Sequence, residues 1–281
     1  MDKLLLVDGS NLLFQMFFGM PSRIVNRSGR AIHAAMGFVG ALLKIVRMTK
    51  PTHVAVLFDG EHENTRSVLN ADYKANRIDY SEVPESENPF SQLPDIYAAL
   101  DYLKIKHAET IDCETDDWIA AYAHTYGNDT KIVISSFDSD YFQLLSETVS
   151  VLRYRGVKTA ICTPDYIRAN FGIAPTQYAD FKSLVGDTAD NIKGAEKVGP
   201  KTAALILSEF KTLEGVLANA EKIERPSIRG SILRDAERLR TNYKLIKLEG
   251  GKEVPFLLEE LKIGDISFTS TETLKGIGIL P

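Results

Sequence analysis

Two acid-rich runs between residues 112 and 140 constrain the fold and chemistry of this chain more than any other feature. The first, 112–117, reads Asp-Cys-Glu-Thr-Asp-Asp and opens a helical pattern, and the second, 138–140, reads Asp-Ser-Asp and follows the β-branched stretch 132–136. Two carboxylates about 4 Å apart repel by roughly 4 kcal/mol at an effective dielectric constant of about 20. Acids gathered in this way therefore need a divalent cation, or a solvated surface on which they stay apart.

Further acids follow two other strand-like stretches. Asp8 ends the apolar run 4–7, and Asp59 ends the run 53–58. Because parallel strands of an open α/β sheet end at one edge, these acids are expected to meet there. Each acid taken singly is also typical of a helix N-cap or a solvated turn. Together, the strand ends and the acid-rich helix start favour one shared metal site for Mg²⁺ or Mn²⁺.

The composition is that of an ordinary soluble globular chain, with 281 residues, 44% hydrophobic and 25% charged. The N-terminus has no basic segment ahead of its short apolar run, so we expect neither a signal peptide nor a membrane span. Cys113 and Cys162 are too few for a disulfide framework or a zinc site and suit a reducing cytoplasm. Without the nine acids named below as metal ligands, the net charge of −5 would become +4, so bulk charge does not exclude a nucleic-acid partner.

The order of the expected elements predicts an α/β fold. A buried strand at 3–8, a helix at 31–47 and a strand at 53–59 form a parallel βαβ unit. The same patterns recur up to about residue 160, in helices at 91–103 and from Glu114 and in strands at 131–136 and 149–154. We therefore expect a mostly parallel central sheet flanked by helices in residues 1–174, and a mostly helical region in residues 175–281. The boundary is placed near Pro175, without a flexible linker.

Residues 60–95 interrupt this pattern between a strand and a helix. The segment is polar and weakly periodic, which is typical of a functional lid or a disordered loop. Tyr73, Lys74 and Arg77 would share one face of a helix, presenting an aromatic ring beside two cations. Spacing alone does not distinguish a phosphate-binding face from a solvated one.

A glycine-punctuated stretch follows at 186–210. Its motif at 194–202 nearly imitates a phosphate-binding P-loop, but Pro200 displaces the lysine and no strand precedes the motif. We predict a helix–hairpin–helix instead, with Pro200 at the start of the second helix. Backbone N–H groups at that helix start would hold a DNA phosphate, assisted by Lys197 and Lys201.

Six motifs and the hairpin occur in order between residue 3 and about residue 203. They are 6–11 (LVDGSN), 51–59 (PTHVAVLFD), 72–77 (DYKANR), 114–117 (ETDD), 138–140 (DSD), 186–192 (GDTADNI) and the hairpin 198–203 (VGPKTA). In these motifs the chain resembles the bacterial 5′→3′ exonuclease/flap endonuclease family, which includes the 5′-nuclease domain of DNA polymerase I and stand-alone exonuclease IX-like proteins.

The resemblance implies two neighbouring sites for divalent cations, Mg²⁺ or Mn²⁺. By position, the first site would take Asp8, Asp59, Glu114, Asp116 and Asp117, and the second Asp138, Asp140, Asp187 and Asp190. Tyr73, Lys74 and Arg77 match the helical arch, here residues 60–95, that handles the 5′ strand and the scissile phosphate. The hairpin would bind duplex DNA, and in the family it can bind K⁺ through main-chain carbonyls. Together, the arch and the hairpin would contact DNA through Arg66, Lys197, Val198, Gly199, Lys201 and Thr202.

The resemblance also implies the activity. We expect a structure-specific 5′ nuclease, a flap endonuclease or 5′→3′ exonuclease or both, that hydrolyses DNA phosphodiester bonds by two-metal catalysis. Its substrates would be DNA with 5′ flaps, nicks or 5′ ends, and the protein would be a cytoplasmic, stand-alone monomer. A PIN-like ribonuclease and a non-catalytic DNA-junction binder are the alternatives. Two positions depart from the family pattern, Gln15 where an arginine is frequent and Phe137 where a glycine is usual.

Overall fold

A six-stranded sheet lies at the centre of the computed structural model, which describes residues 2–60 and 65–281. Its strands are β1 (Lys3–Asp8), β2 (His53–Phe58), β3 (Lys106–Glu109), β4 (Lys131–Ser135), β5 (Val149–Arg153) and β6 (Ala160–Cys162). They lie in the order β3-β2-β1-β4-β5-β6, and every neighbouring pair is parallel except β5 and β6. The predicted mostly parallel central sheet is therefore confirmed.

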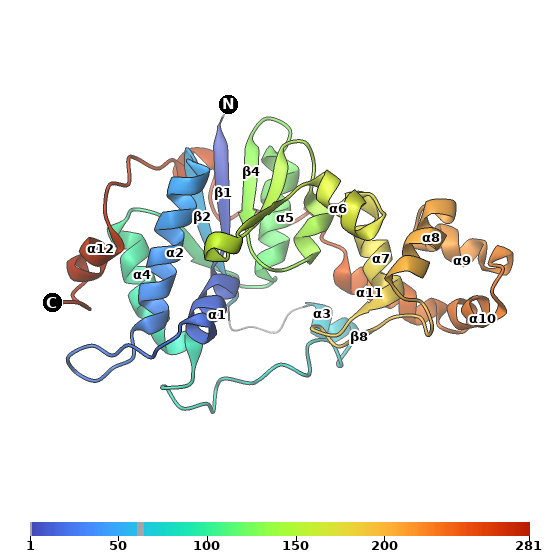
Figure 1. Cartoon of the computed structure of the whole chain (residues 1–281), viewed down its shortest axis with the longest axis horizontal. Coiled ribbons are helices and arrows are strands. Elements are labelled where there is room, and N and C mark those ends of the chain that lie inside the picture. Colours follow the sequence, from blue (N-terminus) through green and yellow to red (C-terminus); the bar gives the residue numbers. More distant parts are fainter. Residues whose placement is uncertain (1, 61–64) are drawn as a thin grey trace.

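The alternation of side chains along the strands divides the core between the two faces of the sheet. Leu5 and Val7 of β1 pack with α2 (His33–Thr49), α4 (Leu93–Tyr102) and α12 (Ser270–Gly276) on one face (Figure 1). Leu4 and Leu6 pack with α5 (Thr115–Tyr126) on the other face. Because both faces are covered, the central strands are continuous apolar runs, as is usual for parallel sheets.

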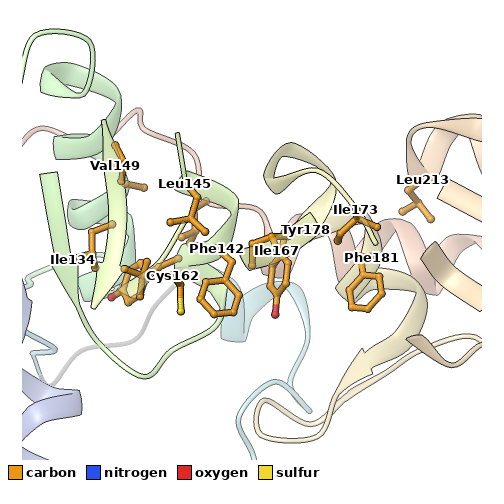
Figure 2. Packing of buried hydrophobic residues seen from close by; sticks show 14 of the residues in the cluster. Ile134, Phe142, Leu145, Val149, Cys162, Ile167, Ile173, Tyr178, Phe181 and Leu213 are labelled. Carbon is orange, nitrogen blue, oxygen red and sulfur yellow. The ribbon is translucent and has the colours of Figure 1, made fainter. Parts of the chain in front are cut away.

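From residue 164 onward the chain is mostly helical. Its helices before α12 are α6 (Pro164–Phe171), α7 (Tyr178–Val185), α8 (Pro200–Phe210), α9 (Leu213–Ala218), α10 (Pro226–Arg234) and α11 (Ala236–Ile246). One hydrophobic cluster runs from the sheet into these helices, and Figure 2 shows Ile134, Phe142, Tyr178, Phe181 and Leu213 within it. Within residues 2–60 and 65–281, no helix has both the length and the apolar character that crossing a membrane requires.

In its described part, the insertion at 60–95 forms the short helix α3 (Thr65–Leu69) and the 3-10 helix Pro89–Gln92, and between them the chain passes below α1 (Gly9–Gly19) in Figure 1. The predicted helical face at residues 73–77 is wrong, because 71–76 form successive turns and Lys74 has a left-handed φ of 58°. Backbone contacts with the other half of the chain replace helical hydrogen bonds here, since the N–H of Lys74 donates to the carbonyl of Asp190 at 3.1 Å.

The helices α7 and α8 are joined by the predicted hairpin. Two short antiparallel strands, β7 (Gly186–Asp187) and β8 (Ile192–Lys193), precede the turn into Pro200, the first residue of α8. Gly186 has φ 90° and ψ 173°, a conformation open almost only to glycine. A Cβ atom at Gly186 would lie 2.5 Å from the backbone nitrogen of Gly194, so the hairpin depends on this close approach.

Replacing Gly186 by alanine is therefore expected to destabilise the protein by at least about 1–3 kcal/mol, the usual cost of such backbone strain. Urea unfolding of the two proteins measures the difference. Gly230→Ala is the matched control, because Gly230 lies inside α10 and a Cβ atom there meets open space. It should be neutral or slightly stabilising. Equal stability of Gly186→Ala and the wild type would contradict the strained hairpin.

Candidate active site

Asp8 lies at the point where the strand order reverses, between β1 and β4, and it has three structural roles. It ends β1, its Oδ1 accepts the N–H of Asn11 at 2.9 Å as the N-cap of α1 (Gly9–Gly19), and its Oδ2 accepts the hydroxyls of Ser136 at 2.9 Å and Tyr141 at 3.1 Å. Burial, and then the charge of Asp59, raise the pKa of Asp8 to about 7. A cation nearby would favour its ionised form.

The second acid group opens α5. Glu114 is the N-cap, and its N–H donates to Asp117 Oδ2 at 3.1 Å in a capping box. Asp59 follows β2 and accepts the N–H of Thr115 at 2.9 Å, which ties the end of that strand to the helix start. The positive end of the helix favours acids here. Burial nevertheless raises the pKa of Asp116 well above its usual range. The charges of Glu114 and Asp117 add to this effect, whereas the charge of Arg66 opposes it.

Arg66 of α3 lies among these acids. Its side chain is 8% exposed, and its guanidinium pairs with Glu114, with Asp116 Oδ1 at 3.1 Å and with Asp117 Oδ1 at 2.6 Å. The sequence predicted a DNA contact for Arg66, but a buried guanidinium must be paired within the protein. This arginine therefore holds the start of the insertion against α5.

A third group joins the two halves of the chain. Asp140, Asp187 and Asp190 each offer a carboxylate oxygen, and these atoms lie within 4.8 Å of one another. No other group of three or more metal-ligating side chains meets that limit in residues 2–60 and 65–281. Burial raises the pKa of Asp140 to about 7 in spite of the nearby ammonium of Lys182.

Asp138, the fourth acid predicted for this site, lies between the triad and Asp8. Its Oδ1 accepts the N–H of Asp140 at 2.8 Å, and its charge contributes to the raised pKa of Asp8. The two predicted acid sets are thus neighbours at one edge, with Asp138 between them.

Lys182 was not predicted from the sequence. This residue of α7 is buried, and its ammonium pairs with both Asp140 and Asp187. The two carboxylates raise its pKa, although burial opposes that effect. A lone lysine in a helical pattern gives no signal of such a role.

The insertion brings an aromatic ring and two more cations to the same place. Tyr73 donates its hydroxyl to Glu114 Oε2 at 3.2 Å, and the Lys74 ammonium pairs with Glu114 and lies 4.8 Å from the centre of the Tyr73 ring. Arg77 Nη2 lies 2.8 Å from Asp190 Oδ1. The turns at 71–77 therefore bring together the three residues that the sequence had grouped on a helix.

The remaining residues predicted to bind DNA, 197–202, follow the strand β8 and surround the start of α8. Val198 is buried in the core, whereas Lys197, Gly199 and Lys201 are exposed and Thr202 is half-buried. Gly199 is the N-cap of α8, and no side chain caps its N–H groups. The N–H groups of this helix start are therefore available to an anion, and the phosphate contact stays a prediction.

Both departures from the family pattern take part in hydrogen bonds of α1. Gln15 of α1 donates to the carbonyl of Tyr154 at 2.7 Å, and the N–H of Phe137 donates to Asn11 Oδ1 at 3.0 Å. Both residues thus connect α1 to the ends of β4 and β5.

Because the acids repel one another until a cation arrives, millimolar Mg²⁺ or Mn²⁺ is expected to raise the melting temperature at constant ionic strength. A ligand at one hundred times its Kd that binds only the folded state adds about 2.7 kcal/mol to its stability. Thermal unfolding in EDTA and in each metal measures this shift, with K⁺ at matched ionic strength as the control. An unchanged melting curve would contradict a cation site among these acids.

Comparison with known families decides the class of the chain. Residues 3–172 match the model of the 5′-3′ exonuclease N-terminal resolvase-like domain, and residues 173–269 match that of the 5′-3′ exonuclease C-terminal SAM fold. The chain belongs to the 5′-3′ exonuclease family. The predicted family and the predicted class of enzyme, a 5′ nuclease, are thereby confirmed.

Relatives of this 5′-3′ exonuclease family member cover it almost completely. It is 33% identical over 265 residues to the 5′-3′ exonuclease of Aquifex aeolicus, an alignment covering 94% of the chain and 87% of the relative. It is also 33% identical to DNA polymerase I of Streptococcus pneumoniae, covering 92% of the chain and 30% of the polymerase. The chain thus spans less than a third of that polymerase.

Solved structures agree with the fold of this family member. The T5 D15 protein co-crystallised with metal ions has a TM-score of 0.73 at 22% identity and covers 88% of the chain and 89% of its own. The catalytic core of Rad2 in complex with DNA substrate has a TM-score of 0.60 at 15% identity and covers 92% and 83%. At these identities the two structures show the shared fold.

Proposed function

We propose that this chain is a structure-specific 5′ nuclease that hydrolyses DNA at 5′ flaps, nicks and 5′ ends with two Mg²⁺ or Mn²⁺ ions, and that it acts as a monomer. The observation that supports this most is the triad of Asp140, Asp187 and Asp190, which meets the Arg77 side chain of the insertion. Acids that attract cations and a basic side chain that suits a phosphate thus adjoin at one edge of the sheet.

The donor chemistry of the acids fits hard cations, which prefer carboxylate oxygens. In this proposal the first ion is held by Asp8, Asp59, Glu114, Asp116 and Asp117, and the second by Asp138, Asp140, Asp187 and Asp190. Two divalent cations in such a site lower the pKa of an attacking water and stabilise the departing oxygen of an in-line displacement.

The chain's own cations position the phosphate in this proposal. Lys74 and Arg77, which now pair with Glu114 and Asp190, exchange these partners for the non-bridging oxygens of the scissile phosphate. Both are tied to the turn at 71–77, so they approach the phosphate from the side of the insertion. Tyr73 keeps that turn anchored through its hydroxyl bond to Glu114.

The helical region from residue 175 holds the duplex in this proposal. The open N-terminus of α8 and the exposed Lys197 and Lys201 take a backbone phosphate, and main-chain carbonyls of the turn 194–199 take a K⁺ ion. Binding of the duplex at the start of α8 sets the distance between that duplex and the acids at the edge of the sheet. Comparing duplex binding in K⁺ with binding in tetramethylammonium tests the proposed potassium site.

One cleavage experiment tests the proposed function. End-labelled 5′-flap, nicked and blunt DNA, together with a 5′-flap RNA of the same sequence, are incubated with the protein in Mg²⁺ and in EDTA. We expect Mg²⁺-dependent cleavage near the junction of the flap and nicked DNA. Cleavage of RNA alone would favour the PIN-like ribonuclease, and tight DNA binding without cleavage would favour the junction binder.

Separate substitutions distinguish chemistry from duplex binding. Lys74→Ala and Arg77→Ala should lower turnover much more than duplex affinity, because both residues lie beside the acids. Lys201→Ala should instead weaken duplex binding and reduce the slope of log K against log salt by about 1, since one phosphate contact is lost. Single-turnover rates and binding isotherms at several salt concentrations measure both. The reverse pattern would mean that the roles of insertion and hairpin are exchanged.

A further inference from the structure

A cleft of about 420 Å³, which the nuclease chemistry does not use, lies between the C-terminal end of α1 and residues 78–87 of the insertion. Phe17 and Phe18 of α1, His33 of α2, and Ile78 and Tyr80 of the insertion line it. The polar side chains Ser22, Arg23, Ser86 and Glu87 also line it. Its walls are thus largely aromatic and apolar, with groups of both charges among them.

The aromatic side chains form a connected set with one open face. The rings of Phe17 and Phe18 meet edge to face with centroids 5.0 Å apart, and the Phe17 ring lies 4.9 Å from that of His33. Phe18 itself is 62% exposed, so its ring offers an accessible apolar face beside the cleft. Burial, and then the charge of Arg23, lower the pKa of His33, so this ring is neutral at neutral pH.

Two elements, α1 and the insertion, connect the acid edge with this cleft. α1 begins at its cap residue Asp8, and Phe17 lies nine residues further along, which is about 14 Å at the usual helical rise. Ile78 directly follows Arg77, whose guanidinium pairs with Asp190. A single strand that leaves the acid edge between α1 and the insertion would therefore pass the mouth of this cleft.

We propose that this cleft is a stacking subsite for a base of the single-stranded 5′ segment of the substrate, a role that rests on the proposed 5′-nuclease function. A nucleobase fits because it is planar, has an apolar face for the Phe18 ring and polar edges for the Arg23 and Glu87 side chains. Stacking of this kind accepts every base, which suits an enzyme that recognises structure. Arg23 Nη2 also bonds to the carbonyl of Ser86, so the loop after α1 and the insertion close the cleft together.

The test compares three nicked duplexes in Ca²⁺, which differ only at the 5′ side of the nick: no flap, a flap of about five nucleotides, and the same flap made abasic. Phe18→Ala is expected to raise the Kd for the base-containing flap about tenfold, which corresponds to the usual worth of one stacked base. The Kd for the other two duplexes should stay unchanged. Phe18→Trp, which keeps an aromatic face, should bind all three like the wild type.

Phe268→Ala is the matched control, because Phe268 is 39% exposed and contacts the Tyr102 ring at the end of α4, away from the cleft. It should leave all three affinities unchanged. The proposed subsite is wrong if Phe18→Ala binds every duplex like the wild type, and a protein side chain would then be the better candidate for the cleft. It is also wrong if Phe18→Ala raises the Kd for all three duplexes equally. If the wild type neither binds nor cleaves any of these duplexes in Mg²⁺, the proposed function fails and the subsite fails with it.

Discussion

Replacing Asp190 by asparagine is expected to lower the rate of DNA cleavage by several orders of magnitude without unfolding the protein. Asparagine keeps the size of the side chain but removes one of the three charges of the Asp140–Asp187–Asp190 triad, so a cation at this site is held less tightly. Single-turnover cleavage at low Mg²⁺ measures the loss. DNA binding in Ca²⁺ should be unchanged or tighter, since one carboxylate near the phosphate loses its negative charge.

A surface acid provides the control for this substitution. Asp165 of α6 is 91% exposed at its side chain and pairs only at the surface with Arg168, so Asp165→Asn should cleave like the wild type. Wild-type cleavage by Asp190→Asn at low Mg²⁺ would instead remove the second cation from the mechanism. The catalytic set would then shrink to the acids around Asp8 and α5.

The second large effect is expected at Lys182, and it should depend on metal. Lys182→Met leaves the buried carboxylate of Asp140 and the half-buried carboxylate of Asp187 without their ammonium partner, and losing one partner of a buried pair costs about 3–5 kcal/mol. We expect that loss in EDTA. Saturating Mg²⁺ should recover most of it, because the cation neutralises the same two carboxylates.

Urea unfolding of Lys182→Met in EDTA and in Mg²⁺ makes this comparison. Lys44→Met serves as the control, since Lys44 is exposed on α2 and its loss should change stability little in either condition. If Lys182→Met is destabilised equally with and without Mg²⁺, the ammonium and the carboxylates form an ion pair that is only structural, and Mg²⁺ does not bind to these carboxylates.

The sheet could be predicted from sequence because its central strands carry their own signal. β1, β2 and β4 are largely apolar runs with an acid at or soon after the strand end, and burial on both faces explains the apolar pattern. β3 was missed because Lys106–Glu109 reads Lys-His-Ala-Glu, and a strand at the edge of a sheet has no need of an apolar run. Its position is set by pairing with β2, which sequence periodicity does not report.

The candidate site was predictable only in part, for a different reason. The acids are recognisable because they cluster in sequence, but their cationic partners come from distant segments. Lys182 lies 42 residues from Asp140, and Arg66 lies 48 residues from Glu114. From the sequence alone, a carboxylate and a phosphate are equally good partners for a basic residue of the insertion. The turn that carries Lys74 was likewise missed, because its left-handed conformation is held by contacts across the fold.

The hydrophobic cluster that runs from the sheet into the helices limits how this chain can be divided. The two family models meet between residues 172 and 173, yet Phe142 and Ile167 before that point share one cluster with Tyr178 and Phe181 after it. A cut there would expose large apolar side chains on both fragments. A chimaera that takes its helical half from a relative should therefore fold only when the cluster residues on both sides of the junction come from the same protein. The segment that can be exchanged is thus longer than the segment matched by either family model.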